Sequence, residues 1–78
     1  MSQKKKNKST IHNPRYRNII NKLVKQRKDA GIKQEEIAKV LNLTQPDISK
    51  IERFERRLDV LEFIDWFSTT SGNSYRFK

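Results

Sequence analysis

Apolar residues recur at helical spacing in one stretch near the middle of the chain. Two separate stripes follow this spacing, Ile37, Val40 and Leu41 in the first and Ile48 and Ile51 in the second. They predict two short helices, over residues 33–41 and 45–53. Ala38 lies beside the first stripe, where a larger side chain would push a crossing helix away. The pattern therefore predicts two helices that pack closely across a short turn.

The residues between the two stripes are those that end one helix and begin another. Asn42 follows the first stripe, and Asn tolerates the left-handed backbone that ends many helices. Thr44 and Asp47 have the spacing of a capping box, and Pro46 falls in the first turn, where a missing N–H costs little. Two helices joined by a three-residue turn are a helix-turn-helix.

A longer helix is expected before this unit. Asn13 and Pro14 are typical of a helix start, and the apolar stripe that follows predicts a helix over residues 14–30. Gly31 is its expected C-cap. The stripe consists of Tyr16, Ile19, Ile20, Leu23 and Val24.

The last expected helix carries more apolar side chains than one face can hold. Asp59 and Glu62 have capping-box spacing, so we expect this helix over residues 59–69. Its large apolar residues and those just before it are Leu58, Val60, Leu61, Phe63, Ile64, Trp66 and Phe67. Part of this set must enter the core, and part must be covered by something else. A fifth helix has no room unless residues 73–78 supply a remnant.

These elements together predict an all-α fold, a compact domain of four and at most five helices. We expect a disordered basic arm at residues 1–12, the helical domain at residues 13–70 and a C-terminal tail at residues 71–78. The arm has one large apolar residue, Ile11, too little to offset its ordering entropy. A chain of 78 residues without cysteine must rely on helix packing or on a partner.

The charge is concentrated at one end of the chain. Residues 1–28 contain ten Lys or Arg and no acid, whereas residues 29–78 contain eight Lys or Arg and nine acids. The whole net charge of +9 is therefore found before Asp29. A charge run is often only a solvated tail, but beside a helix-turn-helix it predicts contact with nucleic acid.

The central stretch resembles the helix-turn-helix of the phage repressor and Cro-like superfamily, the XRE family. The likeness extends from about Tyr16 to Thr69. It is carried by the Gly31–Gln34 entry, the QEEIA start at residues 34–38 and the ISKIER run at residues 48–53. The resemblance implies a lambda-repressor-like fold that binds double-stranded DNA and controls transcription in a prokaryote or a phage.

Two residues depart from the pattern of this family. Asn42 and Phe54 occupy positions where the family usually has Gly. Asn serves for the first, but Phe54 is not expected to supply a relaxed positive φ.

The second helix of such a unit fits the major groove, with its N-terminal residues at the base edges. Gln45 can bond adenine bidentately, and the family commonly contacts a base from this position; Lys50 can reach guanine. Asp47 fits better as the cap partner of Thr44, and Pro46 as a packing residue at the helix entrance or on a thymine methyl group. The full set of expected base contacts is Gln45, Pro46, Asp47, Ser49 and Lys50.

Other polar residues are expected to bind phosphate or to hold the fold. The expected phosphate contacts are Gln34, Thr44, Arg53, Arg56 and Arg57, together with the arm residues Lys4, Lys5, Lys6 and Lys8. In the family, the residue at the position of Gln34 typically grips a phosphate. The resemblance also implies that Arg27 pairs with Glu52, a structural role rather than a base contact.

Residues for catalysis are scarce. His12 is the only histidine, cysteine is absent, and two glycines cannot form a phosphate-binding loop. We therefore expect no enzyme, no metal site and no cofactor. No apolar run approaches the length of a membrane span, so a soluble cytoplasmic protein is expected.

Two other functions stay open at this point, and so does the oligomeric state. The basic arm favours a binder of RNA or DNA without sequence preference, and the apolar last helix favours a protein-interaction module. A homodimer is expected, at least on DNA, with Trp66 and one or more of Phe54, Phe63 and Phe67 at its interface. In the rival arrangement, Tyr75 and Phe77 fold back over the last helix and leave a monomer.

Overall fold

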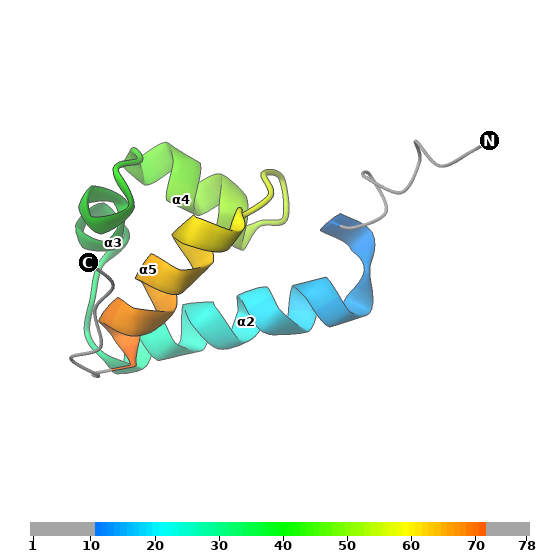
Figure 1. Cartoon of the computed structure of the whole chain (residues 1–78), viewed down its shortest axis with the longest axis horizontal. Coiled ribbons are helices and arrows are strands. Elements are labelled where there is room, and N and C mark those ends of the chain that lie inside the picture. The colour runs from blue at the N-terminus through cyan, green and yellow to red at the C-terminus, as the bar shows by residue number, and fades with distance from the viewer. Residues whose placement is uncertain (1–10, 72–78) are drawn as a thin grey trace.

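The computed structural model describes residues 11–71, and the described chain folds into a group of helices (Figure 1). Their order is α2 (Pro14–Asp29), α3 (Gln34–Leu41), α4 (Gln45–Glu52) and α5 (Val60–Thr70). Residues 11–71 contain no strand, so the predicted all-α fold of four main helices is confirmed. Each helix end lies within one residue of its predicted position.

The two predicted terminal segments lie almost wholly outside the described residues. The exceptions at the start are Ile11 and His12, which were expected as the end of a disordered arm and instead have helical backbone. The helical remnant considered for residues 73–78 also lies outside the described part of the chain.

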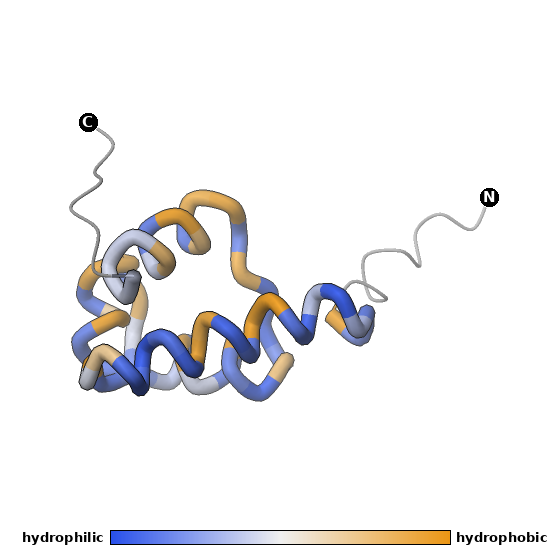
Figure 2. The backbone as a smooth tube through the Cα atoms, turned by 90° about the horizontal axis from the view of Figure 1, so that it is seen from below, coloured by the Kyte–Doolittle hydropathy of each residue, from blue (hydrophilic) through white to orange (hydrophobic). Residues whose placement is uncertain are grey.

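Helix α5 crosses the middle of the molecule. In Figure 1, α2 runs along one side, α3 and α4 lie on the opposite side, and α5 passes between them. Helix α5 accordingly contacts both α2 and α3, and α3 packs on α4. Figure 2 shows hydrophobic and hydrophilic stretches alternating along α2, as expected of a helix with one face in the core.

The core gathers where the four helices meet. Its buried members are Ile20, Leu23, Ile37, Ala38, Leu41, Ile48, Ile51 and Trp66. Trp66 is fully buried, and its indole N–H donates to the backbone carbonyl of Leu23 at 3.2 Å. The prediction of Trp66 as an interface residue is therefore wrong. The largest side chain of α5 thus buries its apolar ring and pairs its one hydrogen-bond donor inside the monomer.

The predicted helix caps are observed. The Oδ1 of Asn13 accepts from the backbone N–H of Arg15 at 2.8 Å at the start of α2. Asp59 and Glu62 exchange two side-chain to backbone bonds of 2.9 and 3.1 Å at the start of α5. Asn42 ends α3 with a φ of 61°, the left-handed backbone that its sequence position predicted.

The turn after α4 differs from expectation. Phe54 adopts a φ of 65°, although an aromatic residue was not expected to take the place of Gly. Its N–H donates to the carbonyl of Ile51 at 3.1 Å, and the N–H of Glu55 donates to the carbonyl of Lys50 at 2.8 Å. These two bonds form a Schellman motif, which satisfies the last carbonyls of α4 and fixes the direction of the next loop.

Candidate nucleic-acid interface

A chain of hydrogen bonds joins three helices at the helix-turn-helix. Arg27 on α2 holds Glu52 at the end of α4 through Nε–Oε2 and Nη2–Oε1 contacts of 2.8 and 3.2 Å. The Nε2 of Gln34 donates to Glu52 Oε1 at 2.8 Å. The Nε2 of Gln45 then donates to Gln34 Oε1 at 2.7 Å. The start of α4 is thus linked to its own end through the start of α3.

The Arg27–Glu52 ion pair forms the buried end of this series of hydrogen bonds. The two side chains are only 8% and 11% exposed, and the third guanidinium nitrogen of Arg27 donates to the carbonyl of Ile32 at 2.8 Å. Among residues 11–71, no buried side-chain nitrogen or oxygen lacks a hydrogen-bond partner. A buried ion pair holds its geometry when its remaining donors and acceptors are satisfied, as they are here.

Gln45 is the last residue in this series of hydrogen bonds. It is half-buried and is the first residue of α4. One N–H of its amide is taken by Gln34, which leaves its Oε1 and its second N–H for another partner. This pair of groups, one acceptor and one donor, matches the N6–H and N7 of adenine. The amide of Gln34 is engaged at both of its ends, by Glu52 and by Gln45.

Thr44 and Asp47 form the predicted capping box. The N–H of Asp47 donates to Thr44 Oγ1 at 3.3 Å, and the N–H of Thr44 donates to Asp47 Oδ2 at 3.1 Å. The bond from the Thr44 backbone, with help from the Thr44 hydroxyl, holds the pKa of the Asp47 carboxyl below its ordinary value of 3.8. Asp47 therefore stays ionised, and one of its oxygens is used within α4 itself.

The remaining candidates for base contact lie along the outer side of α4. Pro46 and Lys50 are exposed, and Ser49 is half-buried. The hydroxyl of Ser49 accepts from a guanidinium nitrogen of Arg53, one turn further along the helix. Ser49 and Arg53 thus present a joint polar surface rather than two independent side chains.

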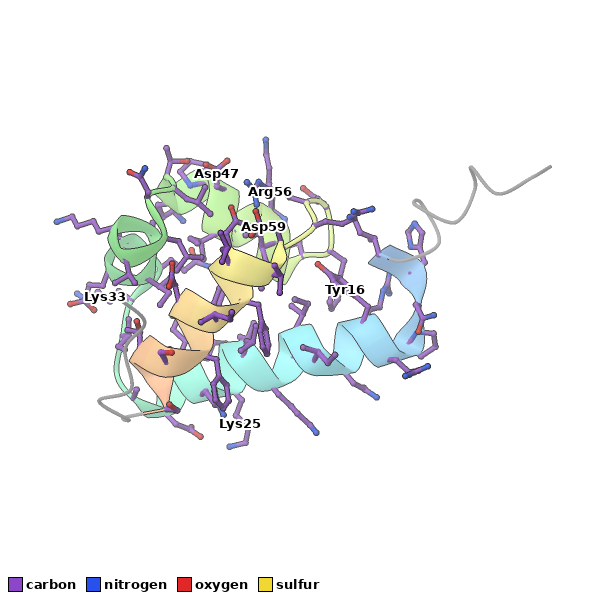
Figure 3. The ribbon with its side chains drawn as sticks, viewed as in Figure 1. Tyr16, Lys25, Lys33, Asp47, Arg56 and Asp59 are labelled. Atoms are coloured by element: carbon purple, nitrogen blue, oxygen red, sulfur yellow. The ribbon has the colours of Figure 1, made fainter. Side chains whose placement is uncertain are left out.

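The arginines after α4 are held by acids. Arg53 contacts Glu55 at 3.1 and 3.3 Å, and Arg56 makes two contacts with Glu62 at 3.1 and 3.3 Å. The hydrogen bonds to these carboxylates raise the pKa of both arginines above their ordinary range. In Figure 3, Asp47 and Arg56 lie on one side of the molecule, and Lys25 lies on the opposite side.

Sequence reasoning missed three links in this region. It named Gln34 and Gln45 separately and did not place them in contact, although both are the first residues of neighbouring helices. It also missed Tyr16, whose hydroxyl accepts from the backbone N–H of Leu58 at 3.1 Å (Figure 3). The third link is Arg17, whose guanidinium carbon lies 4.5 Å from the centre of the Phe54 ring.

Comparison with known families agrees with this geometry. A family model described as Helix-turn-helix matches residues 23–65, more than half of the chain. The chain belongs to this family, the XRE-type helix-turn-helix proteins, and is a DNA-binding helix-turn-helix regulator. No curated protein matches the sequence.

Within residues 11–71, no group of three or more His, Cys, Asp or Glu is placed to hold a metal ion. None of the helices found there is both long enough and apolar enough to cross a membrane.

Proposed function

We propose that the protein recognises a specific sequence in double-stranded DNA with α4 in the major groove, and so regulates transcription. The regulator is proposed to be of the repressor, antitoxin-like or controller type and to act in the cytoplasm, on the nucleoid. The observation that carries the proposal is the Gln34–Gln45 contact of 2.7 Å at the N-terminal ends of α3 and α4. N-terminal residues of such a helix are the ones that meet base edges.

The fixed orientation of the Gln34 and Gln45 side-chain amides supports readout of the DNA sequence. A free glutamine presents either end of its amide to a base, but Glu52 accepts only from the nitrogen end of Gln34. The oxygen of Gln34 then selects the nitrogen end of Gln45. Gln45 therefore offers an acceptor and a donor in a fixed order, which suits adenine and not guanine, whose O6 and N7 are both acceptors. A bidentate contact of this kind contributes about 1–3 kcal/mol of discrimination.

The other proposed base contacts follow the same side of α4. Lys50 is exposed and is proposed to donate to guanine, and Pro46 to pack on a thymine methyl group. Ser49 is proposed to reach a base or phosphate together with Arg53. Asp47 Oδ2 already accepts from the backbone N–H of Thr44. The proposed contact with a cytosine N4 therefore uses the lone pairs of the carboxylate that Thr44 does not occupy.

The proposed phosphate contacts come from several parts of the sequence. Gln34 is the first residue of α3, Thr44 is the N-cap of α4, and Arg53, Arg56 and Arg57 follow α4. The other proposed contacts, Lys4, Lys5, Lys6 and Lys8, belong to the N-terminal segment. Arg53 and Arg56 are each paired with a carboxylate, so a phosphate that either arginine contacts would share its guanidinium with Glu55 or Glu62, or replace that carboxylate.

We also propose a homodimer, with α5 as the contact between copies. Val60 and Leu61 are 68% and 69% exposed, and Phe67 is 41% exposed. The half-buried Phe63 stacks on Phe67 with ring centres 6.0 Å apart, so the two rings extend this apolar surface. A two-fold dimer would place two copies of α4 about 34–36 Å apart on one face of DNA. Phe54 is less suited to the interface because Arg17 covers its ring.

Selection of bound sequences from a random DNA pool, followed by footprinting of the selected site, tests the proposal. We expect one consensus with protection centred on the major groove, in two half-sites one helical turn apart. Binding with a steep salt dependence but no enriched sequence would instead indicate the non-specific nucleic-acid binder. Absence of binding to DNA, with capture of a protein through α5, would indicate an interaction module.

A further inference from the structure

We propose that Tyr16 is a positioning residue that fixes the direction in which Arg57 meets a phosphate of the DNA. It acts on the peptide unit between Arg57 and Leu58. This inference rests on the proposed function, in which Arg57 is one of the phosphate contacts. It deepens that function by naming the residue of α2 on which this contact depends.

The peptide unit between Arg57 and Leu58 is held at both of its polar ends. Its N–H, which belongs to Leu58, donates to the hydroxyl of Tyr16 at 3.1 Å. Its carbonyl, which belongs to Arg57, accepts from Nη1 of Arg56 at 3.1 Å. Because a peptide unit is planar, holding both ends fixes the orientation of the whole plane. The two bonds therefore restrict the ψ angle of Arg57, one of the backbone angles that decide where its side chain points.

Both partners of this peptide unit are themselves held by helices. Tyr16 belongs to α2, and its half-buried ring packs against the hydrophobic core. Arg56 makes two contacts with Glu62 of α5, at 3.1 and 3.3 Å. In Figure 3, Tyr16 lies between α2 and the loop that follows α4. The end of this loop is thus fixed relative to α2 on one side and α5 on the other.

The beginning of the same loop is fixed as well. Phe54 holds the left-handed position of the Schellman motif that ends α4. Its half-buried ring packs against the core, and the guanidinium carbon of Arg17 lies 4.5 Å from the ring centre. Consecutive residues of α2, Tyr16 and Arg17, therefore contact the loop near its two ends, at Leu58 and at Phe54.

This arrangement matters for Arg57 because its side chain is exposed and carries a charge that suits a phosphate. A loop that is already ordered in the free protein loses less entropy on binding than a mobile loop. Contacts to phosphates set the register of a protein on the duplex. With its backbone held, Arg57 is expected to meet one phosphate of the site. Without the hydroxyl of Tyr16, it is expected to reach several neighbouring phosphates, each more weakly.

Amide hydrogen exchange in the free protein tests whether Tyr16 holds Leu58. We expect the Leu58 N–H to be protected in the parent. Tyr16→Phe keeps the ring in the core and removes only the hydroxyl, so exchange at Leu58 should become about three- to ten-fold faster, the range of one net hydrogen bond. Thr70→Val is the matched control. It removes a buried hydroxyl that donates to the carbonyl of Trp66 at 3.0 Å, at the other end of α5, and should leave exchange at Leu58 unchanged.

Scanning the selected DNA site with single methylphosphonates tests whether the bond positions Arg57. Each substitution removes the negative charge of one phosphate, so the loss of affinity maps the phosphates that the protein contacts. Arg57→Gln identifies the phosphate of Arg57, because that position should lose its effect while the others keep theirs. Tyr16→Phe should weaken the effect at the same position and at no other. Thr70→Val should leave the map unchanged.

Affinity and its salt dependence give a second readout in the same proteins. Arg57→Gln should lower the slope of log K against log salt by roughly 0.9, the contribution of one phosphate contact. Tyr16→Phe should weaken binding to the selected site by about three- to ten-fold. In the Arg57→Gln background it should have a smaller effect, because no guanidinium is left to position.

The outcomes are distinct. A Leu58 amide that exchanges in the parent as fast as an unprotected loop amide would overturn the inference, whether or not the variants fold. A phosphate map that Tyr16→Phe leaves unchanged would also overturn it, with sequence-specific binding intact, and would assign the hydroxyl to stability alone. Equal effects of Tyr16→Phe with and without the Arg57 guanidinium would do the same. If selection yields no preferred DNA site at all, the proposed function fails first, and the inference fails with it even where Leu58 is protected.

Discussion

The side-chain nitrogen of Gln45 donates to the side-chain oxygen of Gln34 at 2.7 Å, and this bond joins the first residues of α3 and α4. Gln34 is fixed in turn by Glu52, which Arg27 holds. The donor and acceptor that Gln45 presents outward are therefore set by a charge pair at the far end of α4.

This series of hydrogen bonds leads to a prediction for Gln34 that would not follow if Gln34 only contacted a phosphate. Gln34→Ala should reduce discrimination at the base that Gln45 contacts, by about 1 kcal/mol, because the Gln45 amide can then turn either end toward the groove. Affinities for the selected site and for its single-base variants measure this. A loss that is uniform over all variants would indicate that Gln34 only binds phosphate.

Removing one partner of the buried ion pair should strongly destabilise the fold. Arg27→Met leaves the Glu52 carboxylate buried and unpaired in charge, so we expect a loss of about 3–5 kcal/mol in the free energy of unfolding, measured with urea. Lys25→Met is the matched control. Its ion pair with Asp29 is 75% and 66% exposed, and its loss should cost no more than about 1 kcal/mol. Equal effects of the two substitutions would contradict the assigned role of Arg27.

The capping box should make stability depend on acid pH. Hydrogen bonds from Thr44 lower the pKa of Asp47 in the folded state below its ordinary value of 3.8. Asp47 therefore stabilises the fold at pH values above about 4, and this contribution is lost as the pH falls through the lowered pKa. Unfolding of the parent and of Asp47→Asn, followed from pH 7 to pH 2, should show a difference that is constant at neutral pH and shrinks in acid. A difference that is independent of pH would exclude this linkage.

The two sides of α5 should respond differently to substitution. Leu61→Glu places a charge on an exposed apolar side chain and should shift the protein toward monomer with little loss of stability. Trp66→Ala empties a fully buried site and should cost about 3–5 kcal/mol of stability. Sedimentation equilibrium, with and without the selected DNA, measures the association. A monomeric parent on a single site would contradict the proposed dimer.

Local sequence signals were enough to place the helices and their caps. Asn13, Asn42, Thr44 and Asp59 each satisfy backbone groups within a few residues of themselves, so their roles depend on local spacing alone. Helix ends could be predicted to within one residue for that reason.

Contacts between distant residues were harder to predict. The surplus of apolar residues on α5 indicated that some are buried and some exposed, but it did not show which. Trp66 was assigned to an interface because periodicity gives the faces of a helix and not its rotation against α2 and α3. Phe54 was judged unfit for positive φ because the partner that covers its ring, Arg17, lies 37 residues earlier in the chain.

Paired affinity measurements on Gln45→Ala test the central claim, that α4 reads a DNA sequence through Gln45. Binding to the selected site and to random duplex DNA is measured for parent and variant at one salt concentration. We predict a loss of about 1–3 kcal/mol on the selected site and almost no change on random DNA, because phosphate contacts are retained. An equal loss on both DNAs, or no loss on either, would contradict the assignment of Gln45 as a base contact.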